Sequence, residues 1–61
     1  MNEDSEIGEV ILELIRNGPY LKCSAVHVAT GVEVSAFGPA AEPEGLKRIA
    51  LAKLKRALLS R

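Results

Sequence analysis

Two segments in the middle of the chain alternate apolar and polar residues with the two-residue period of a β-strand. The segment from 20 to 28 divides into two faces, with Leu21, Cys23 and Ala25 on one and Tyr20, Lys22, Ser24, Val26 and Val28 on the other. The segment from 32 to 37 divides in the same way, with Val32, Val34 and Ala36 opposite Glu33, Ser35 and Phe37. Thr30-Gly31 lies between them, and glycine accepts the positive φ angle that tight turns need. The pattern therefore predicts two strands joined by a turn.

The segment from 7 to 16 fits two periodicities. Ile7, Val10, Ile11, Leu14 and Ile15 recur at helical spacing. The same stretch also alternates, with Val10, Leu12 and Leu14 on one face and Glu9, Ile11, Glu13 and Ile15 on the other. A strand is favoured because Gly8 and the Val and Ile content disfavour a helix, and because Asn17-Gly18 is a strong hairpin signal. The helix stays open as the alternative, and the preferred interpretation is a three-stranded antiparallel meander.

The last third of the chain has the pattern of an amphipathic helix. Gly38-Pro39 ends the preceding strand, since proline cannot donate to a strand ladder, and Pro43 suits the first turn of a helix. Six apolar residues form the stripe predicted to face the sheet, with Leu51 at its flank: Leu46, Ile49, Ala50, Leu54, Ala57 and Leu58. The predicted fold is α+β in β-β-β-α order, with the helix packed on one sheet face. We expect that face to be the one that carries Leu12 and Leu14.

The size of the chain limits how much apolar surface it can hide. A chain of 61 residues allows one domain, and a domain of this size buries only about 60% of its unfolded surface. The hydrophobic content is 48%, more than so small an interior can hide, which favours burial against a partner. We expect residues 1–6, which include three acidic residues, to be a disordered N-terminus, and residues 7–61 to form the domain.

The charge balance argues against an electrostatic partner. Eight acidic and eight basic residues cancel, so no net field attracts the molecule to nucleic acid or acidic lipid. No uncharged apolar run approaches the length of a membrane-spanning helix, and no membrane association is expected. The single cysteine, Cys23, cannot close an internal disulfide, which favours the cytoplasm as the compartment.

Several turn and core residues form a familiar arrangement: Thr30-Gly31 leading into Glu33-Val34-Ser35, then Gly38-Pro39-Ala40, and Leu46, Ala50 and Lys53-Leu54 in the terminal helix. With these residues the chain resembles a family of short, uncharacterised bacterial proteins, a domain of unknown function, over residues 8–58. The resemblance implies the β-β-β-α order and a strand for the first segment. It implies no activity, cofactor or partner.

No group of residues in the sequence indicates catalysis. Cys23 and His27 share a strand face but lie four residues apart, about 13 Å, too far for one metal ion or for a hydrogen bond. Cys23 is interpreted as a core residue and His27 as a solvated or hydrogen-bonded side chain beside the turn. Glu9 and Glu13 share a face, but one short sheet provides no enclosed cleft for acid–base chemistry. We expect a protein that is not an enzyme, with no catalytic, cofactor-binding or metal-binding residues.

The expected function is that of a small protein-interaction module that forms a homodimer or binds an unidentified protein partner. The predicted interface is the sheet face that the helix leaves uncovered, or an edge strand, and its apolar residues are Ile11, Ile15, Tyr20, Val26 and Phe37. The alternative is a nucleic-acid-associated accessory protein, and the residues that would contact phosphates are Lys47, Arg48, Lys53, Lys55 and Arg56. Nucleic acid is disfavoured because two aromatic residues are too few for a base-stacking platform.

Overall fold

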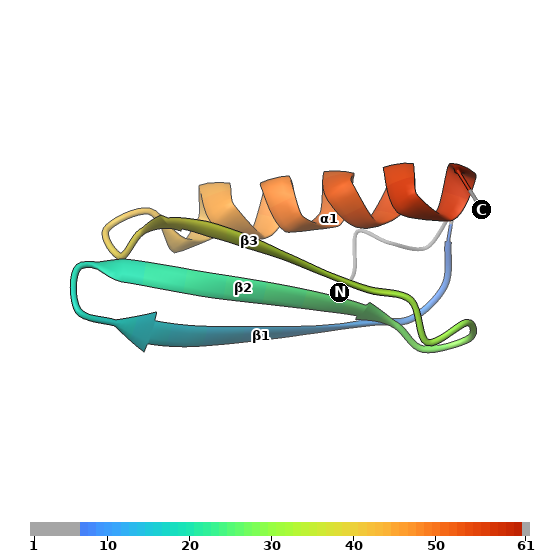
Figure 1. The fold of residues 1–61 in the computed structure, drawn as a ribbon, viewed down its shortest axis with the longest axis horizontal. Coiled ribbons are helices and arrows are strands. Elements are labelled where there is room, and N and C mark those ends of the chain that lie inside the picture. The colour runs from blue at the N-terminus through green and yellow to red at the C-terminus, as the bar shows by residue number, and fades with distance from the viewer. Residues whose placement is uncertain (1–6, 61) are drawn as a thin grey trace.

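The computed structural model describes residues 7–60 and has the β-β-β-α order. Strand β1 (Val10–Asn17) pairs antiparallel with β2 (Tyr20–His27), and β2 pairs antiparallel with β3 (Glu33–Pro39), so β2 is the central strand. Helix α1 (Pro43–Leu59) lies across one face of the sheet, and no other described element covers the opposite face (Figure 1). The α+β prediction is confirmed, and the segment that fitted both periodicities is a strand. The expected disorder of residues 1–6 lies outside the described residues.

A tight hairpin joins β1 to β2 and fixes their register. Asn17 pairs with Tyr20, so Gly18 and Pro19 alone form the loop, and Gly18 adopts a φ angle of +65°. Glycine with positive φ followed by proline gives a turn whose twist matches that of the strands it joins. Arg16 Nε also donates to the carbonyl oxygen of Gly18 at 2.9 Å. The hairpin thereby determines which side chains of β1 share the face with α1.

His27 organises the turn between β2 and β3, and its side chain is 7% exposed. Its Nε2 lies 2.6 Å from the carbonyl oxygen of Ile7, which can only accept, so Nε2 carries a hydrogen. In the neutral ring, Nδ1 accepts from the Thr30 hydroxyl at 2.7 Å, and the same hydroxyl oxygen accepts the N–H of Val32 at 3.3 Å. Gly31, at a φ angle of +77°, donates its N–H to the carbonyl oxygen of His27 at 2.7 Å. Of the two environments expected for His27, the hydrogen-bonded one is confirmed.

The core lies between α1 and the side of the sheet formed by β2 and β3. Its buried members are Leu21, Cys23, Ala25, Ala36, Leu46, Ala50 and Leu54. The sheet contributes mostly small side chains to this list, so the larger leucines of the helix fit closely against the strands. Cys23 and Leu54 are each 0% exposed, which confirms that Cys23 is a core residue.

Gly38 provides the space in which the start of the helix packs on β3. A Cβ atom at this position would lie 3.2 Å from Cδ1 of Leu46, whose side chain is 2% exposed. The sequence predicted that the strand stops at Phe37, before Gly38 and Pro39. In the structure β3 continues through both residues and ends at Pro39. The next residue still pairs with the sheet, because the N–H of Ala40 donates to the carbonyl oxygen of Pro19 at 2.8 Å. The absence of a side chain at Gly38 therefore allows Leu46 of the helix to pack closely against β3.

Two predictions about the helix are wrong in detail. Ile49 was predicted in the apolar stripe but is 55% exposed, whereas Leu51 from the flank is buried. Leu14 was predicted beneath the helix but is 38% exposed, because α1 packs against β2 and β3. The helix is thus displaced from β1, and the side chains of this strand are only partly covered. Within residues 7–60, no helix has both the length and the apolar character needed to cross a membrane.

Substitution of Gly38 tests the close contact with Leu46. We expect Gly38→Ala to lower the free energy of unfolding by about 1–3 kcal/mol, since the added methyl group displaces a buried leucine from its packed position. Urea denaturation followed by circular dichroism measures this change. The matched control is Gly45→Ala, because a Cβ there meets no atom within 4 Å. This control should not destabilise the protein, and equal losses for the two variants would contradict the packing argument.

Substitution of His27 tests the hydrogen bonds around the β2–β3 turn. We expect His27→Ala to lower the free energy of unfolding by about 1–3 kcal/mol, because the carbonyl oxygen of Ile7 and the Thr30 hydroxyl both lose a partner. Thr30→Val removes only one of these bonds and should cost about 1 kcal/mol. Chemical denaturation of the two variants provides the comparison. A His27→Ala variant as stable as the wild type would refute the role assigned to this ring.

Candidate functional site

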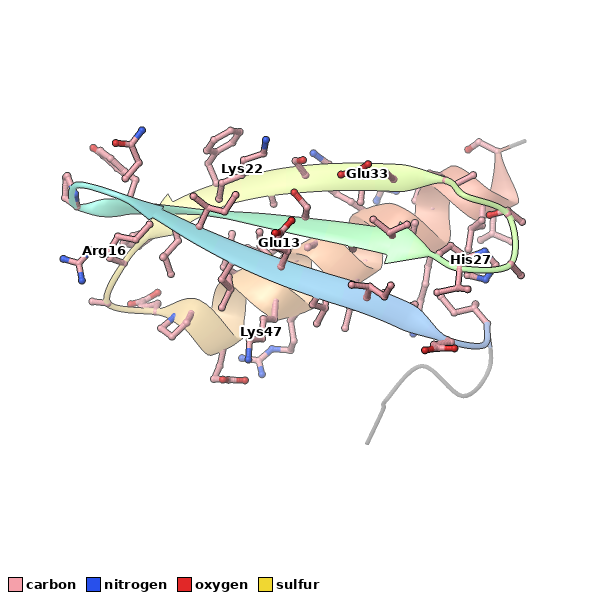
Figure 2. All side chains as sticks on the ribbon, turned by 90° about the horizontal axis from the view of Figure 1, so that it is seen from below. Glu13, Arg16, Lys22, His27, Glu33 and Lys47 are labelled. Carbon is pink, nitrogen blue, oxygen red and sulfur yellow. The ribbon has the colours of Figure 1, made fainter. Side chains whose placement is uncertain are left out.

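The sheet face opposite α1 is the candidate functional site, and we call it the open face. Strand alternation and the pairing registers place these residues on it: Ile11, Glu13 and Ile15 of β1, Tyr20, Lys22, Ser24 and Val26 of β2, and Glu33, Ser35 and Phe37 of β3. Figure 2 looks onto this face, with α1 behind the sheet, and shows Glu13, Lys22 and Glu33 distributed over the three strands. All five residues of the predicted interface belong to this set.

The apolar side chains of the open face are unusually exposed. Phe37 is 71% exposed, Tyr20 60%, Ile11 54% and Ile15 49%, whereas Val26 on the central strand is partly buried. Single exposed apolar residues are common on protein surfaces, but several on one sheet face are typical of a binding surface. The structure therefore brings together the residues that the sequence assigned to the interface.

The hairpin end of the open face forms a hollow around Lys22. Ile15 and Phe37 are the direct cross-strand neighbours of Lys22 on β1 and β3. Together with Tyr20 and Asn17 they line an open hollow of about 270 Å³. The aliphatic part of a lysine side chain can lie along such apolar walls while its ammonium group stays in water. This end of the face suits an apolar group with an acidic neighbour.

The middle of the open face is polar. Glu13, Ser24 and Ser35 form one cross-strand row, and the hydroxyl oxygens of Ser24 and Ser35 lie 3.4 Å apart. Ser24 is only 6% exposed, because it lies on the central strand between larger neighbours. The row separates the hollow around Lys22 from the second apolar group, which contains Ile11 and Val26. A partner of this face must accommodate a polar row between two apolar patches.

The helix cations that the sequence proposed for phosphate contact are divided between two sides of α1. Lys47, Arg48 and Lys55 line a groove of about 420 Å³ between the helix and β1, whose apolar part is formed by Leu12, Leu51 and Ala52. Lys53 and Arg56 border a separate hollow beside Ile49. The sequence pattern does not predict this groove, since an apolar stripe alone does not show which strands the helix covers.

Lys47 and Lys53 each contact an oxygen atom of the protein. Lys47 Nζ lies 3.2 Å from the Glu44 carboxylate one turn before it. Lys53 Nζ donates to the backbone carbonyl oxygen of Ser35 on β3 at 2.5 Å. Both ammonium groups therefore already interact with oxygen atoms of the protein, which argues against a phosphate-binding surface on the helix.

The titratable residues form no catalytic constellation among residues 7–60. Cys23 lies in the core, whereas His27 is at the far end of β2 and uses both ring nitrogens in structural hydrogen bonds. Burial raises the pKa of the Cys23 thiol above its ordinary value, and the Lys47 ammonium opposes this shift only in part. No group of three or more His, Cys, Asp or Glu side chains in the described part of the chain could hold a metal ion.

The comparisons with known proteins identify a family. No match is found among curated proteins or among solved structures. The family described as Domain of unknown function (DUF6898) matches residues 7–61, which include the whole sheet and the helix. The chain therefore belongs to this family.

Proposed function

We propose that the chain is a small, non-enzymatic protein-interaction module that associates with copies of itself through the open face. The observation that carries this proposal is the group of four large apolar side chains on that face, each about half or more exposed: Ile11, Ile15, Tyr20 and Phe37. The family match adds no activity to this argument, because the family is defined only as a domain of unknown function. A bacterial cytoplasmic location belongs to the same proposal and is supported by the unpaired, buried thiol of Cys23.

The energetics favour an association of modest strength. Full burial of one large apolar side chain contributes about 1.5–3 kcal/mol, so covering four half-exposed ones contributes several kcal/mol in total. The loss of translational and rotational freedom opposes this with about 4–15 kcal/mol. The four residues of one copy do not balance this cost alone, but a symmetric contact buries the same four residues of the second copy and doubles the gain. The two contributions are then comparable, so we expect a weak self-association, and a tight complex needs further contacts.

A nucleic-acid-associated accessory role is the second candidate. Its support is that Lys47, Arg48 and Lys55 line the same groove beside β1. Against it, Glu44 belongs to the same groove and pairs with Lys47, and no aromatic residue lines it. Binding to RNA or DNA that weakens steeply with added salt would favour this second candidate, whereas self-association through apolar residues changes little with salt.

Phe37→Asp tests the open face as the association surface. The new carboxylate would have to be buried against the partner, so we expect the average molar mass in sedimentation equilibrium to fall relative to the wild type at the same concentration. Ile49→Asp is the matched control, since Ile49 is 55% exposed on the helix, away from the sheet. Equal molar masses for the wild type and Phe37→Asp would overturn the proposal.

Cys23 provides a test of the non-enzymatic part of the proposal. Because burial raises its pKa, the thiolate is scarce at neutral pH, and we expect a disulfide reagent such as dithionitrobenzoate to react only as fast as the protein unfolds. The rate should rise to that of a free thiol in urea. Cys23→Ala should keep the fold and the association, with a loss of stability of about 1 kcal/mol. Rapid labelling of the folded protein would instead indicate an accessible, activated nucleophile.

A further inference from the structure

The hydrogen-bonding groups of β1 that face away from β2 have no partner strand. The N–H of Val28 donates to the carbonyl oxygen of Glu9 at 3.1 Å, and this bond fixes which residues of β1 bond to β2. In an antiparallel ladder the bonded positions alternate, so Ile11, Glu13 and Ile15 direct their backbone groups toward β2. The backbone groups of the intervening residues point outward along the free edge: Val10, Leu12, Leu14 and Arg16.

The other edge of the sheet is protected. The N–H of His27 donates to the carbonyl oxygen of Val32, so the outward backbone groups of β3 belong to the odd-numbered residues from Glu33 to Pro39. Pro39 has no N–H to offer to another strand, and Lys53 of α1 occupies the outward carbonyl oxygen of Ser35. Proline and lysine are the residues with which natural sheets prevent edge-to-edge pairing.

Strand β1 is less protected, since its charged residues are limited to Glu13 and Arg16. It is eight residues long and contains no proline, lysine or glycine. Helix α1 packs mainly against β2 and β3, and no described strand lies beside the outer edge of β1. The side chains next to the edge are also exposed, with Leu14 at 38% and Ile15 at 49%. An edge of this length and composition is a template for another strand.

We propose that β1 pairs antiparallel with β1 of a second copy, in a register that places Glu13 opposite Glu13 of the partner subunit. This inference rests on the proposed self-association and names its first contact. The strand is self-complementary in this register, because Leu12 lies opposite the partner's Leu14 and Ile11 opposite the partner's Ile15. The outward backbone groups of Leu12 and Leu14 then exchange hydrogen bonds with the partner. Seven residues of each strand take part, from Val10 to Arg16.

The pairing creates one continuous sheet from two three-stranded ones. Its two-fold axis runs perpendicular to the sheet, so both helices lie on one side and both open faces lie on the other. The four isoleucines contributed by the two copies of β1 meet at the seam. The resulting apolar surface is twice as wide as that of one chain and stays available for a second assembly contact, in which Phe37 takes part.

Glu13 sets the strength of this pairing. Its carboxylate lies on the open face of β1 (Figure 2). In the proposed pairing it faces the same carboxylate of the partner at the two-fold axis. Like charges in direct cross-strand pairs weaken the pairing. Neutralising both with Glu13→Gln should tighten the dimer by about two- to five-fold. The charged groups nearest to Glu13 on the same face are Lys22 and Glu33, which keep their signs in this variant.

Disulfide formation tests the register, and it is best measured in the Phe37→Asp background, where contact between open faces is removed. Cysteine at position 13 of both copies satisfies the distance of a disulfide, so Glu13→Cys should give a covalent dimer on mild oxidation. Ile11→Cys and Ile15→Cys should not cross-link alone, since identical positions lie about 13 Å apart, but a mixture of the two should. The parent chain is the blank, because its single thiol, Cys23, is buried.

Two backbone variants test the edge itself. Leu14→Pro removes an outward N–H from β1, and Ser35→Pro removes an outward N–H from β3, so the two changes are matched on opposite edges. We expect Leu14→Pro to lower the molar mass and Ser35→Pro to leave it unchanged, with circular dichroism confirming that both variants fold. If Leu14→Pro fails to fold, the cross-linking pattern decides alone.

The outcomes separate this inference from the proposed function. A protein that associates, that responds to Phe37→Asp, and that shows no cross-link at position 13 and no effect of Leu14→Pro would overturn the edge pairing and keep the open face. Cross-linking through Leu12→Cys or Leu14→Cys in place of Glu13→Cys would overturn the stated register. A cross-linked position 13 together with no effect of Phe37→Asp would leave the edge as the association surface.

Discussion

The width of one helix compared with the width of three strands determines most of this structure. A helix with its side chains is about 10 Å wide, whereas neighbouring strands lie about 4.8 Å apart, so one helix covers about two strands. Helix α1 packs on β2 and β3, and β1 is left at the margin. The exposure of Leu14 and the groove between Leu12 and Leu51 both follow from this offset. A single helix therefore leaves one strand of a three-stranded sheet partly exposed.

The same offset makes the two edges of the sheet different. Because α1 lies over β3, Lys53 of the helix reaches the outward carbonyl oxygen of Ser35 and blocks that edge. The small side chains beneath the helix, Ala36 among them, and the space at Gly38 bring the helix close enough for this contact. Strand β1 lies at the opposite edge of the sheet, beyond the two strands on which the helix mainly packs. The packing of α1 on β2 and β3 thus forms the core and also protects the edge at β3. It does not protect the edge at β1.

The sequence was sufficient for the fold and for the face of each strand, since alternation and turn residues report both. The sequence could not show which strands the helix covers, because alternation places Leu14 on the helix side of the sheet without showing whether the helix contacts it. The stripe of α1 was ambiguous because Ile49 and Leu51 are both apolar, and the tertiary contact selects one of them. The partners of His27 were unpredictable for the same reason, as one of them lies 20 residues away in the sequence. The exposed apolar residues of the open face were predictable because residues such as Phe37 alternate along the strands with core residues.

The residues that carry the family resemblance are structural. Thr30 and Gly31 form the turn that His27 holds, and Gly38 gives Leu46 its space, so each accounts for the fold. Function is carried by specific sites and not by a fold, and here the exposed apolar residues of the open face lie outside these motif residues. Phe37, at 71%, is the most exposed of the large apolar residues of the open face, so its ring has little contact with the described residues. A change at position 37 should therefore keep the sheet and the helix while altering the surface that the open face presents to a partner.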